Sequence, residues 1–303
     1  MSEGLFIAGD WGTTRLRLAL CDKKGILDRR DGPGIAALTA SPEATFLSLI
    51  GDWHSRYGAL PAYFCGMVGS RNGWREAPYA PCPADPRSLL EAALHFTAGD
   101  HAIAIAPGLS CANPLGAPDV MRGEETQILG AILAHPGLGS GRHLLALPGT
   151  HSKWVELQDG SVRRFMTTPT GELFALLRAH STLTKAAPDG AHATAAGFAA
   201  GLARGRETKG RAGLLQTLFE TRTRQLIDGM AADDAVGFLS GLLIGGDVDG
   251  ALDCFGTPAS THLIGEPALV ALYAQALAGA GVDSTILNGT DCAFTGLRAI
   301  FAP

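Results

Sequence analysis

The sequence predicts an α/β protein with two domains, and three observations favour this class. Short apolar runs that suit strands alternate with segments whose apolar residues recur at helical spacing. A strand, a Gly-Thr turn and an alternating strand occur twice, in IAGDWGTTRLRLAL (7–20) and LALPGTHSKWVEL (145–157). A chain of 303 residues is long enough for two hydrophobic cores. We expect domains at 1–117 and 118–303, divided in the loop CANPLGAPDV.

Local patterns justify the elements of the N-terminal half. Residues 15–20 alternate leucine with other residues, which is typical of a strand with one buried face. A helix is expected over 42–57, because Pro42 suits a first helical turn and apolar residues follow at helical spacing. The other expected elements are strands at 4–9, 26–34, 62–70 and 101–108, several of which run into loops, and a helix at 87–96.

The C-terminal half reads in the same way. A helix is expected to begin near Val120, and a second hairpin is expected over 143–157. Residues 261–277 predict a strand, a turn at Gly265 and a helix in which Pro267 takes the first position.

Composition limits the classes of function. The net charge is −5, which gives no electrostatic reason to expect nucleic acid or an anionic membrane surface as a partner. We also expect no membrane span, because no run reaches the roughly 18 apolar residues that a span needs. The six cysteines form no CxxC pair and are expected to be reduced thiols, so the expected location is the cytoplasm.

The first hairpin tip gathers groups that bind phosphate and metal. Gly12 allows a tight turn whose N–H groups point to one side, and the hydroxyls of Thr13 and Thr14 add further donors. Asp10 stands at the end of the first strand and is a candidate ligand of Mg²⁺, which could bridge phosphates. The alternative is an ordinary hairpin, in which the same side chains satisfy the turn backbone.

The second hairpin repeats the Gly-Thr pair as Gly149 and Thr150 but has Pro148 in place of the acid. Two such tips, one from each domain, could hold a triphosphate from both sides. His151 and Lys153 are expected to be solvated strand residues. Gly265 would allow a flat ring to approach its turn closely, although an unremarkable strand–helix unit explains the same residues.

Two consecutive glutamates, Glu124 and Glu125, are expected in the first turn of a helix. Acidic residues there favour the helix dipole, which is one explanation of the pair. The other is that one carboxylate acts as general base for a sugar hydroxyl, because an alcohol must lose its proton as it attacks phosphorus. The two side chains point about 100° apart, so they cannot serve this role equally.

Taken together, the sequence resembles the sugar kinases of the actin-like ATPase superfamily, in the order found in their glycerol kinase-like branch. The motifs are DWGTT (10–14), RGEETQILG (122–130), LPGTHSKW (147–154) and HLIGEP (262–267). A closer similarity is to the 2-dehydro-3-deoxygalactonokinase family. It rests on DWGTTRLR (10–17), GMVGSRNGWREAPYAPCP (66–83), MRGEETQILG (121–130), LPGTHSKWV (147–155) and TGELFALLRAHSTL (170–183).

The resemblance implies two actin-like (ribonuclease H-like) domains around a cleft, each a mixed five-stranded sheet flanked by helices. It implies ATP-dependent phosphorylation of the terminal 6-hydroxyl of 2-dehydro-3-deoxy-D-galactonate, in galactonate or galactose breakdown. By the resemblance, Asp10 serves the Mg²⁺ ion, and Gly12, Thr13, Thr14, Gly149 and Thr150 serve the phosphates. Gly265 meets the adenosine. Glu124 is the inferred base, with Glu125 as its competitor.

A sugar acid needs a fixed cation in its site, and arginine suits a carboxylate. Arg71 is the first candidate, Asn72 could bind hydroxyls and Trp74 could give a stacking face. Arg15 and Arg122 are reserve candidates, and a surface loop arginine is the plain alternative for Arg71.

Other functions stay open at this point: a kinase-fold sugar sensor without catalysis, a kinase for a related 2-keto-3-deoxy acid, and an actin-like scaffold. The sequence also leaves open the preferred stereoisomer, the metal contacts of the second domain and the oligomeric state, for which a homodimer is one candidate.

Overall fold

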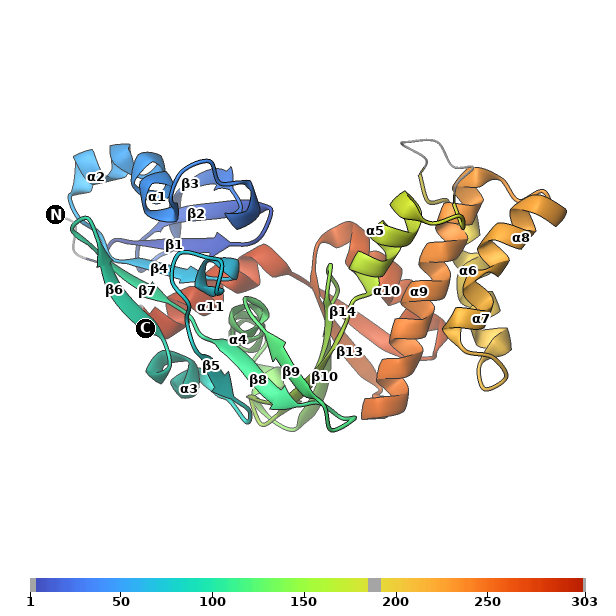
Figure 1. The fold of residues 1–303 in the computed structure, drawn as a ribbon. Coiled ribbons are helices and arrows are strands. Elements are labelled where there is room, and N and C mark those ends of the chain that lie inside the picture. The colour runs from blue at the N-terminus through green and yellow to red at the C-terminus, as the bar shows by residue number, and fades with distance from the viewer. Residues whose placement is uncertain (1–3, 185–191, 302–303) are drawn as a thin grey trace. The chain divides into compact units, whose positions relative to one another are not determined.

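A computed structural model describes residues 4–184 and 192–301 (Figure 1). Its internal contacts divide the chain into two compact units. Unit 1 runs up to His143 and adds Val155–Phe165 and the segment from Leu287 onward. Unit 2 holds Leu144–Trp154 and Met166–Ile286.

The largest sheet of unit 1 has six strands and mixed direction. Strands β1, β2 and β3 form an antiparallel meander, whereas β1, β4 and β7 run parallel and β6 closes the edge antiparallel to β7. The strand order is β3 (Ile26–Pro33), β2 (Arg15–Cys21), β1 (Phe6–Trp11), β4 (Ala62–Cys65), β7 (His101–Ile105) and β6 (Leu94–Ala98).

Helices and a small sheet complete unit 1. The helices are α1 (Pro42–Leu49), α2 (Gly51–Tyr57), α3 (Pro86–Glu91), α4 (Glu124–Ala134) and α11 (Gly289–Phe301), with 3₁₀ turns η1 (Ile35–Ala37), η2 (Met67–Gly69) and η3 (Pro136–Gly139). The small sheet has the order β5 (Tyr79–Pro81), β8 (Gly108–Ala112) and β9 (Pro118–Met121).

The two faces of the six-stranded sheet carry different side chains. Ile7 and Trp11 alternate with Asp10 along the end of β1, and they share a buried cluster with Phe46 of α1 and Trp53 of α2. Helix α11 contacts β1 and β4. The side chain of Asp10 therefore leaves β1 on the face opposite to the α1–α2 cluster, because successive strand residues point to opposite faces.

Helix α4 packs closely along α11. A Cβ atom on Gly130 would collide with the carbonyl of Cys292, and one on Gly296 would collide with the carbonyl of Thr126. This packing explains why the internal contacts place residues 118–143 in unit 1, whereas the predicted division at 117 and 118 put them in the second domain. The two units are defined by contacts within the structure and need not coincide with domains, so the boundary between residues 117 and 118 stays a prediction.

A five-stranded sheet has the order β12 (Ser161–Thr168), β11 (Ser152–Gln158), β10 (Arg142–Leu147), β13 (Ser260–Gly265) and β14 (Asp283–Asn288). Strands β10 and β13 run parallel. The helices of unit 2 are α5 (Thr170–His180), α6 (Ala195–Thr208), α7 (Leu214–Leu218), α8 (Glu220–Ile227), α9 (Ala232–Phe255) and α10 (Pro267–Gly279).

Helix α9 lies at the centre of unit 2 and packs on α6 through glycines. A Cβ on Gly201 would meet the carbonyl of Phe238, and a Cβ on Gly241 would meet the carbonyl of Phe198. By length and composition α9 could cross a membrane, which corrects the expectation that the chain holds no such run. However, 83% of its apolar window is buried within the structure, as in the core helix of a globular unit.

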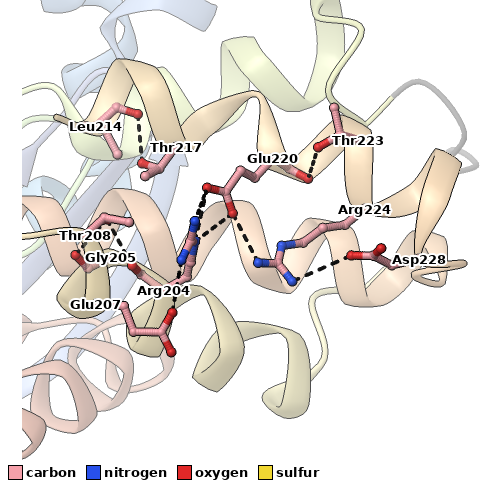
Figure 2. Close-up of polar contacts among 10 residues, drawn as sticks. All are labelled: Arg204, Gly205, Glu207, Thr208, Leu214, Thr217, Glu220, Thr223, Arg224 and Asp228. Carbon is pink, nitrogen blue, oxygen red and sulfur yellow. Dashed lines mark hydrogen bonds and ion pairs between the residues drawn. The ribbon is translucent and has the colours of Figure 1, made fainter. Parts of the chain in front are cut away.

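A charged cluster joins α6 to α8 (Figure 2). Arg204 donates hydrogen bonds to the Glu220 carboxylate from Nε and Nη2 at 2.8–3.0 Å, and Arg224 donates to the same carboxylate at 3.1 Å. Hydrogen bonds from Arg204 hold the pKa of Glu220 below its usual value. These contacts hold α8 beside α6.

The α/β class with mixed sheets is confirmed, and the structure corrects four local expectations. The largest sheet has six strands instead of five. The helix expected over 42–57 is broken at Ile50. The helix expected over 87–96 ends at Glu91, and its last residues belong to strand β6 (Leu94–Ala98). Val120 lies in β9, where it pairs with Ser110 of β8. Helix α4 begins only after Gly123, whose φ is 108°.

Candidate active site

The hairpin tip of unit 1 is held by its own backbone. The Gly12 N–H donates to the Arg15 carbonyl at 2.9 Å. The carbonyls of Gly12 and Thr13 accept from Ile35 and Ala36 of η1, each at 3.0 Å. The side chains of Thr13, Thr14 and Arg15 remain exposed. The tip is therefore a fixed turn that presents hydroxyl groups to solvent.

Asp10 lies at the base of this tip and is mostly buried. Its side chain is 18% exposed, and its Oδ2 accepts from Nη1 of the register partner Arg17 at 3.3 Å. Burial raises the pKa of Asp10, the Arg17 guanidinium opposes this, and the charge of Glu124 raises the pKa further. Asp10 and Glu124, which are 114 positions apart, therefore lie within electrostatic reach of each other.

Two glycines allow this approach. Gly66 has a φ of 90°, and a Cβ on it would sit 2.9 Å from the carbonyl of Trp11. Gly123 has a φ of 108°, and a Cβ on it would sit 3.2 Å from the Cα of Gly66. Left-handed backbone favours glycine at both positions, and the missing side chains let the ends of β1 and β4 meet the start of α4.

The two glutamates at the start of α4 have different environments. Glu124 is half-buried, and its Oε2 accepts from the Arg122 N–H at 3.0 Å. Glu125 is 1% exposed and accepts from the Gly123 N–H at 2.6 Å and from Thr126 Oγ1 at 3.0 Å. Burial, assisted by the neighbouring charge of Glu124, raises the pKa of Glu125 to about 8. Of the two glutamates, Glu124 is the more accessible, and its charge is the one that acts on Asp10.

The loop after η2 carries the predicted sugar-acid residues. Arg71 and Asn72 are exposed. Trp74 is half-buried, and its ring packs against Trp11 and Phe96 at centroid distances of 6.2 and 5.2 Å. The stacking role of Trp74 stays a prediction, because the contacts observed for this ring belong to the hydrophobic core.

The reserve candidate Arg122 has an unusual environment. Its guanidinium lies over the Tyr79 ring at 4.3 Å, and its Nη2 donates to the Ala77 carbonyl at 2.8 Å. Its Nε and Nη1 are buried and have no hydrogen-bond partner among the described residues. The packing holds this cation rigidly, two residues before Glu124.

The tip of the second hairpin is braced by the start of α5. The Glu172 N–H donates to the Thr150 carbonyl at 3.0 Å, and the Glu172 carboxylate contacts His151 Nε2 at 2.7 Å. Lys153 is 4% exposed and donates to the His151 carbonyl, so the expectation of a solvated lysine is wrong. The tip has a defined shape because its backbone is hydrogen-bonded to helix α5 as well as within the hairpin.

Gly265 lies next to this second tip. A Cβ on Gly265 would be 3.3 Å from the Pro148 carbonyl and 3.2 Å from Val270 Cγ1. Strands β10 and β13 run parallel, which brings their carboxyl ends together. Gly149, Thr150 and Gly265 therefore lie at the carboxyl ends of two neighbouring strands, β10 and β13, in unit 2.

A buried carboxylate that the sequence patterns did not single out bonds to residues around the second hairpin and α5. Asp247 of α9 accepts four hydrogen bonds: from Trp154 Nε1 and Thr168 Oγ1 on Oδ1, and from Thr170 Oγ1 and the Tyr273 hydroxyl on Oδ2. It is 5% exposed. A lone acid in the apolar run GFLSGLLIGGDV was the available signal, because a charge is rarely buried unless it is partnered.

Unit 1 presents a fixed hairpin tip with a mostly buried acid at its base, and unit 2 presents a second Gly-Thr tip. Features of this kind are typical of phosphoryl-transferring enzymes of the α/β class. Comparison with known proteins agrees: residues 10–300 match the family described as 2-keto-3-deoxy-galactonokinase. The chain belongs to this family and is a carbohydrate kinase. The family supports ATP as the phosphoryl donor.

Three relatives illustrate the similarity. A protein of Rhizobium meliloti (strain 1021), named as a 2-dehydro-3-deoxygalactonokinase, is 39% identical over 98% of this chain and 97% of its own. Another so named, from Escherichia coli (strain K12), is 36% identical over 97% of each chain. A crystal structure from Sinorhizobium meliloti under the same enzyme name has a TM-score of 0.87, at 36% identity, and covers 98% of this chain and 100% of its own.

Proposed function

We propose that this chain transfers the γ-phosphoryl group of ATP to the terminal 6-hydroxyl of 2-dehydro-3-deoxy-D-galactonate. The reaction belongs to galactonate or galactose breakdown and takes place in the cytoplasm. The family and the names of the relatives support this substrate. The observation that supports the chemistry is that Gly66 lies against both Asp10 and Gly123, which brings the start of α4, with Glu124, toward the mostly buried Asp10.

Glu124 is the proposed general base. The attacking hydroxyl must lose a proton, and a carboxylate that accepts it has to be ionised and reachable. Glu125 meets neither condition near pH 7, because it is buried and its pKa of about 8 keeps most of it protonated. We assign Glu125 to the support of the helix start, where it accepts the Gly123 N–H.

Asp10 is the proposed ligand of Mg²⁺. The donor set fits this ion, since carboxylate oxygens are hard ligands and Glu124 adds negative charge nearby. Arg17 donates a hydrogen bond to Oδ2 of Asp10, and the other oxygen, Oδ1, faces Gly66. When bound, Mg²⁺ supplies positive charge to the phosphates of the donor.

Each hairpin tip is a proposed phosphate-binding element of its own unit. In unit 1, Gly12, Thr13 and Thr14 offer N–H and hydroxyl donors to phosphate oxygens. In unit 2, Gly149 and Thr150 offer donors of the same kind. Gly265 is proposed to meet the adenosine, because its missing side chain leaves the turn open to a flat ring.

The sugar acid is assigned to the loop after η2. Arg71 is the proposed partner of the substrate carboxylate, since a guanidinium can bind both oxygens at once. Asn72 would bind hydroxyl groups, Trp74 would offer a stacking face, and Arg15 at the exposed hairpin tip is the second cation. The exposure of Arg71 and Asn72 supports these roles.

A coupled assay of ADP release tests the proposal. We expect release that depends on the added sugar acid, and a loss of about 10²–10⁴-fold in kcat for Glu124→Gln. ATP binding should persist in this variant. The matched variant Glu125→Gln should keep most of the turnover, because the buried amide can still accept a hydrogen bond.

Three outcomes would redirect the assignment. Full activity of Glu124→Gln together with loss in Glu125→Gln would make Glu125 the base. Sugar-acid binding without ADP release would favour a sensor. A screen that includes the gluconate-derived 2-keto-3-deoxy acid, which differs at one hydroxyl, would reveal a kinase for a related acid.

A further inference from the structure

Three side chains with metal-binding atoms converge in unit 1 at the turn between β6 and β7. His54 comes from the last turn of α2, Asp100 from the turn itself and His101 from the first position of β7. His54 Nδ1 and His101 Nε2 are 3.0 Å apart. Oδ1 of Asp100 lies 3.9 Å from His54 Nδ1 and 3.8 Å from His101 Nε2.

His101 is held as a metal-binding histidine would be. It is 1% exposed, and its Nδ1 lies 2.8 Å from the Leu60 carbonyl oxygen and 3.2 Å from the Leu60 nitrogen. The Leu60 N–H donates to Nδ1, and the Leu60 carbonyl oxygen lies close to the same nitrogen, so the backbone holds the ring in place. An ion bound at Nε2 requires the tautomer with the proton on Nδ1, and the Leu60 carbonyl is placed to accept that proton.

The spacing suits a small divalent ion. The three interatomic distances place a point about 2.1 Å from each of the three atoms, which is the length of Zn²⁺ bonds to imidazole nitrogen and carboxylate oxygen. Two imidazoles favour Zn²⁺ over Mg²⁺, which prefers oxygen. The side chains of His54 and Asp100 are 44% and 66% exposed, so an ion can enter from solvent and water can complete the coordination.

We propose that His54, Asp100 and His101 form a Zn²⁺ site that fastens helix α2 to the β6–β7 turn. This site is separate from the proposed Mg²⁺ ligand Asp10 and is independent of the proposed reaction. Because the ion binds only when α2 and the turn are in place, it stabilises the folded chain in proportion to its occupancy. Without an ion, the two rings share a hydrogen bond.

Titration of the chelator-stripped full chain with Zn²⁺ tests the site. We expect one equivalent to bind in competition with a chromophoric chelator, and the midpoint of thermal unfolding to rise with added Zn²⁺. In His54→Ala the affinity should fall at least tenfold and the thermal shift should disappear. Asp100→Asn should show a smaller loss. The control His95→Ala removes an exposed histidine of β6 outside the cluster and should behave like the wild type.

Two results would overturn the proposal. The first is unchanged affinity and thermal shift in His54→Ala, which would place the ion elsewhere, for example on the free cysteines. The second is the lack of stoichiometric binding by the wild type, which would leave a histidine pair joined by a hydrogen bond only. Circular dichroism of each variant without metal establishes that it is folded, so that a lost affinity reports on the ligand.

Discussion

The substitution Asp247→Asn tests whether one buried carboxylate supports the part of unit 2 that is proposed to bind the nucleotide. The carboxylate accepts four hydrogen bonds, two on each oxygen. Asparagine has the same shape but replaces one oxygen with an amino group, which donates. It also removes the negative charge. The Trp154 indole can only donate, so the amide oxygen must stay toward it, and the Thr170 and Tyr273 hydroxyls must turn round to accept from the amino group.

The expected effect follows from the lost charge. A hydrogen bond to a charged group contributes about 1.5–3 kcal/mol, against about 0.5–1.5 kcal/mol for one between neutral groups. A loss of about 1 kcal/mol at each of the four bonds lowers the free energy of unfolding by about 4 kcal/mol. This is a large part of the roughly 5–15 kcal/mol that stabilises a typical domain. The burial of Asp247, at 5% exposure, keeps water from compensating for the weaker bonds.

The loss should also reach the second hairpin tip. The Tyr273 hydroxyl, which donates to Asp247, lies 2.8 Å from Ser152 Oγ, and that oxygen accepts from the Gly149 N–H at 3.4 Å. Thr170, another of the four donors, opens helix α5. Because these contacts shape the proposed phosphate loop, we expect the KM for ATP to rise more than the KM for the sugar acid.

Urea unfolding and steady-state kinetics measure both effects, with Asp253→Asn as the control. Asp253 lies on the same helix, is 66% exposed and pairs with Lys209 at 3.1 Å. Its replacement should change stability by less than about 1 kcal/mol, as for other exposed ion pairs. The reasoning fails if Asp247→Asn unfolds at the same urea concentration as Asp253→Asn.

Three further predictions concern the site and the packing. Arg71→Ala should raise the KM for the sugar acid far more than that for ATP, unlike the exposed control Arg87→Ala; equal effects on both substrates would reject the carboxylate role. The pKa of Glu125 rises from 4.5 to about 8 on folding, so stability should fall as pH rises between these values. Glu125→Gln should flatten this dependence in thermal scans, and an unchanged slope would assign it to other groups. Gly241→Ala should destabilise the chain by about 1–3 kcal/mol through overpacking. In contrast, Gly250→Ala on the same helix has open space and should be neutral or stabilising in urea titrations; similar losses in both would contradict the packing argument.

Local patterns were sufficient where neighbouring residues decide the structure. The hairpin of β1 and β2 followed from alternation around a Gly-Thr turn, and helix α10 from Pro267 at its first position. The sequence was misleading where a distant contact decides. Residues 94–98 are strand β6 because they pair with β7, and Val120 is in β9 because it pairs with β8.

The candidate site was predictable in part for the same reason. Asp10 and the glutamate pair could be identified from their motifs, and the helical angle between Glu124 and Glu125 showed that they differ. Their burial, which favours Glu124, depends on how α4 meets the strand ends at Gly66. Asp247 acquired its role from four partners spread over more than a hundred residues, a set that no local window contains.

The sequence alone determined the class of this protein, its two Gly-Thr turns and the carboxylates that qualify for phosphoryl transfer. These depend on residue type and short spacing, which the chain carries along its length. Only the tertiary structure decided which carboxylate is accessible, which is buried with a raised pKa, and which accepts four hydrogen bonds in the core of unit 2. Those properties come from desolvation and from donors brought together across the chain, and they exist only once the sheets and helices have packed.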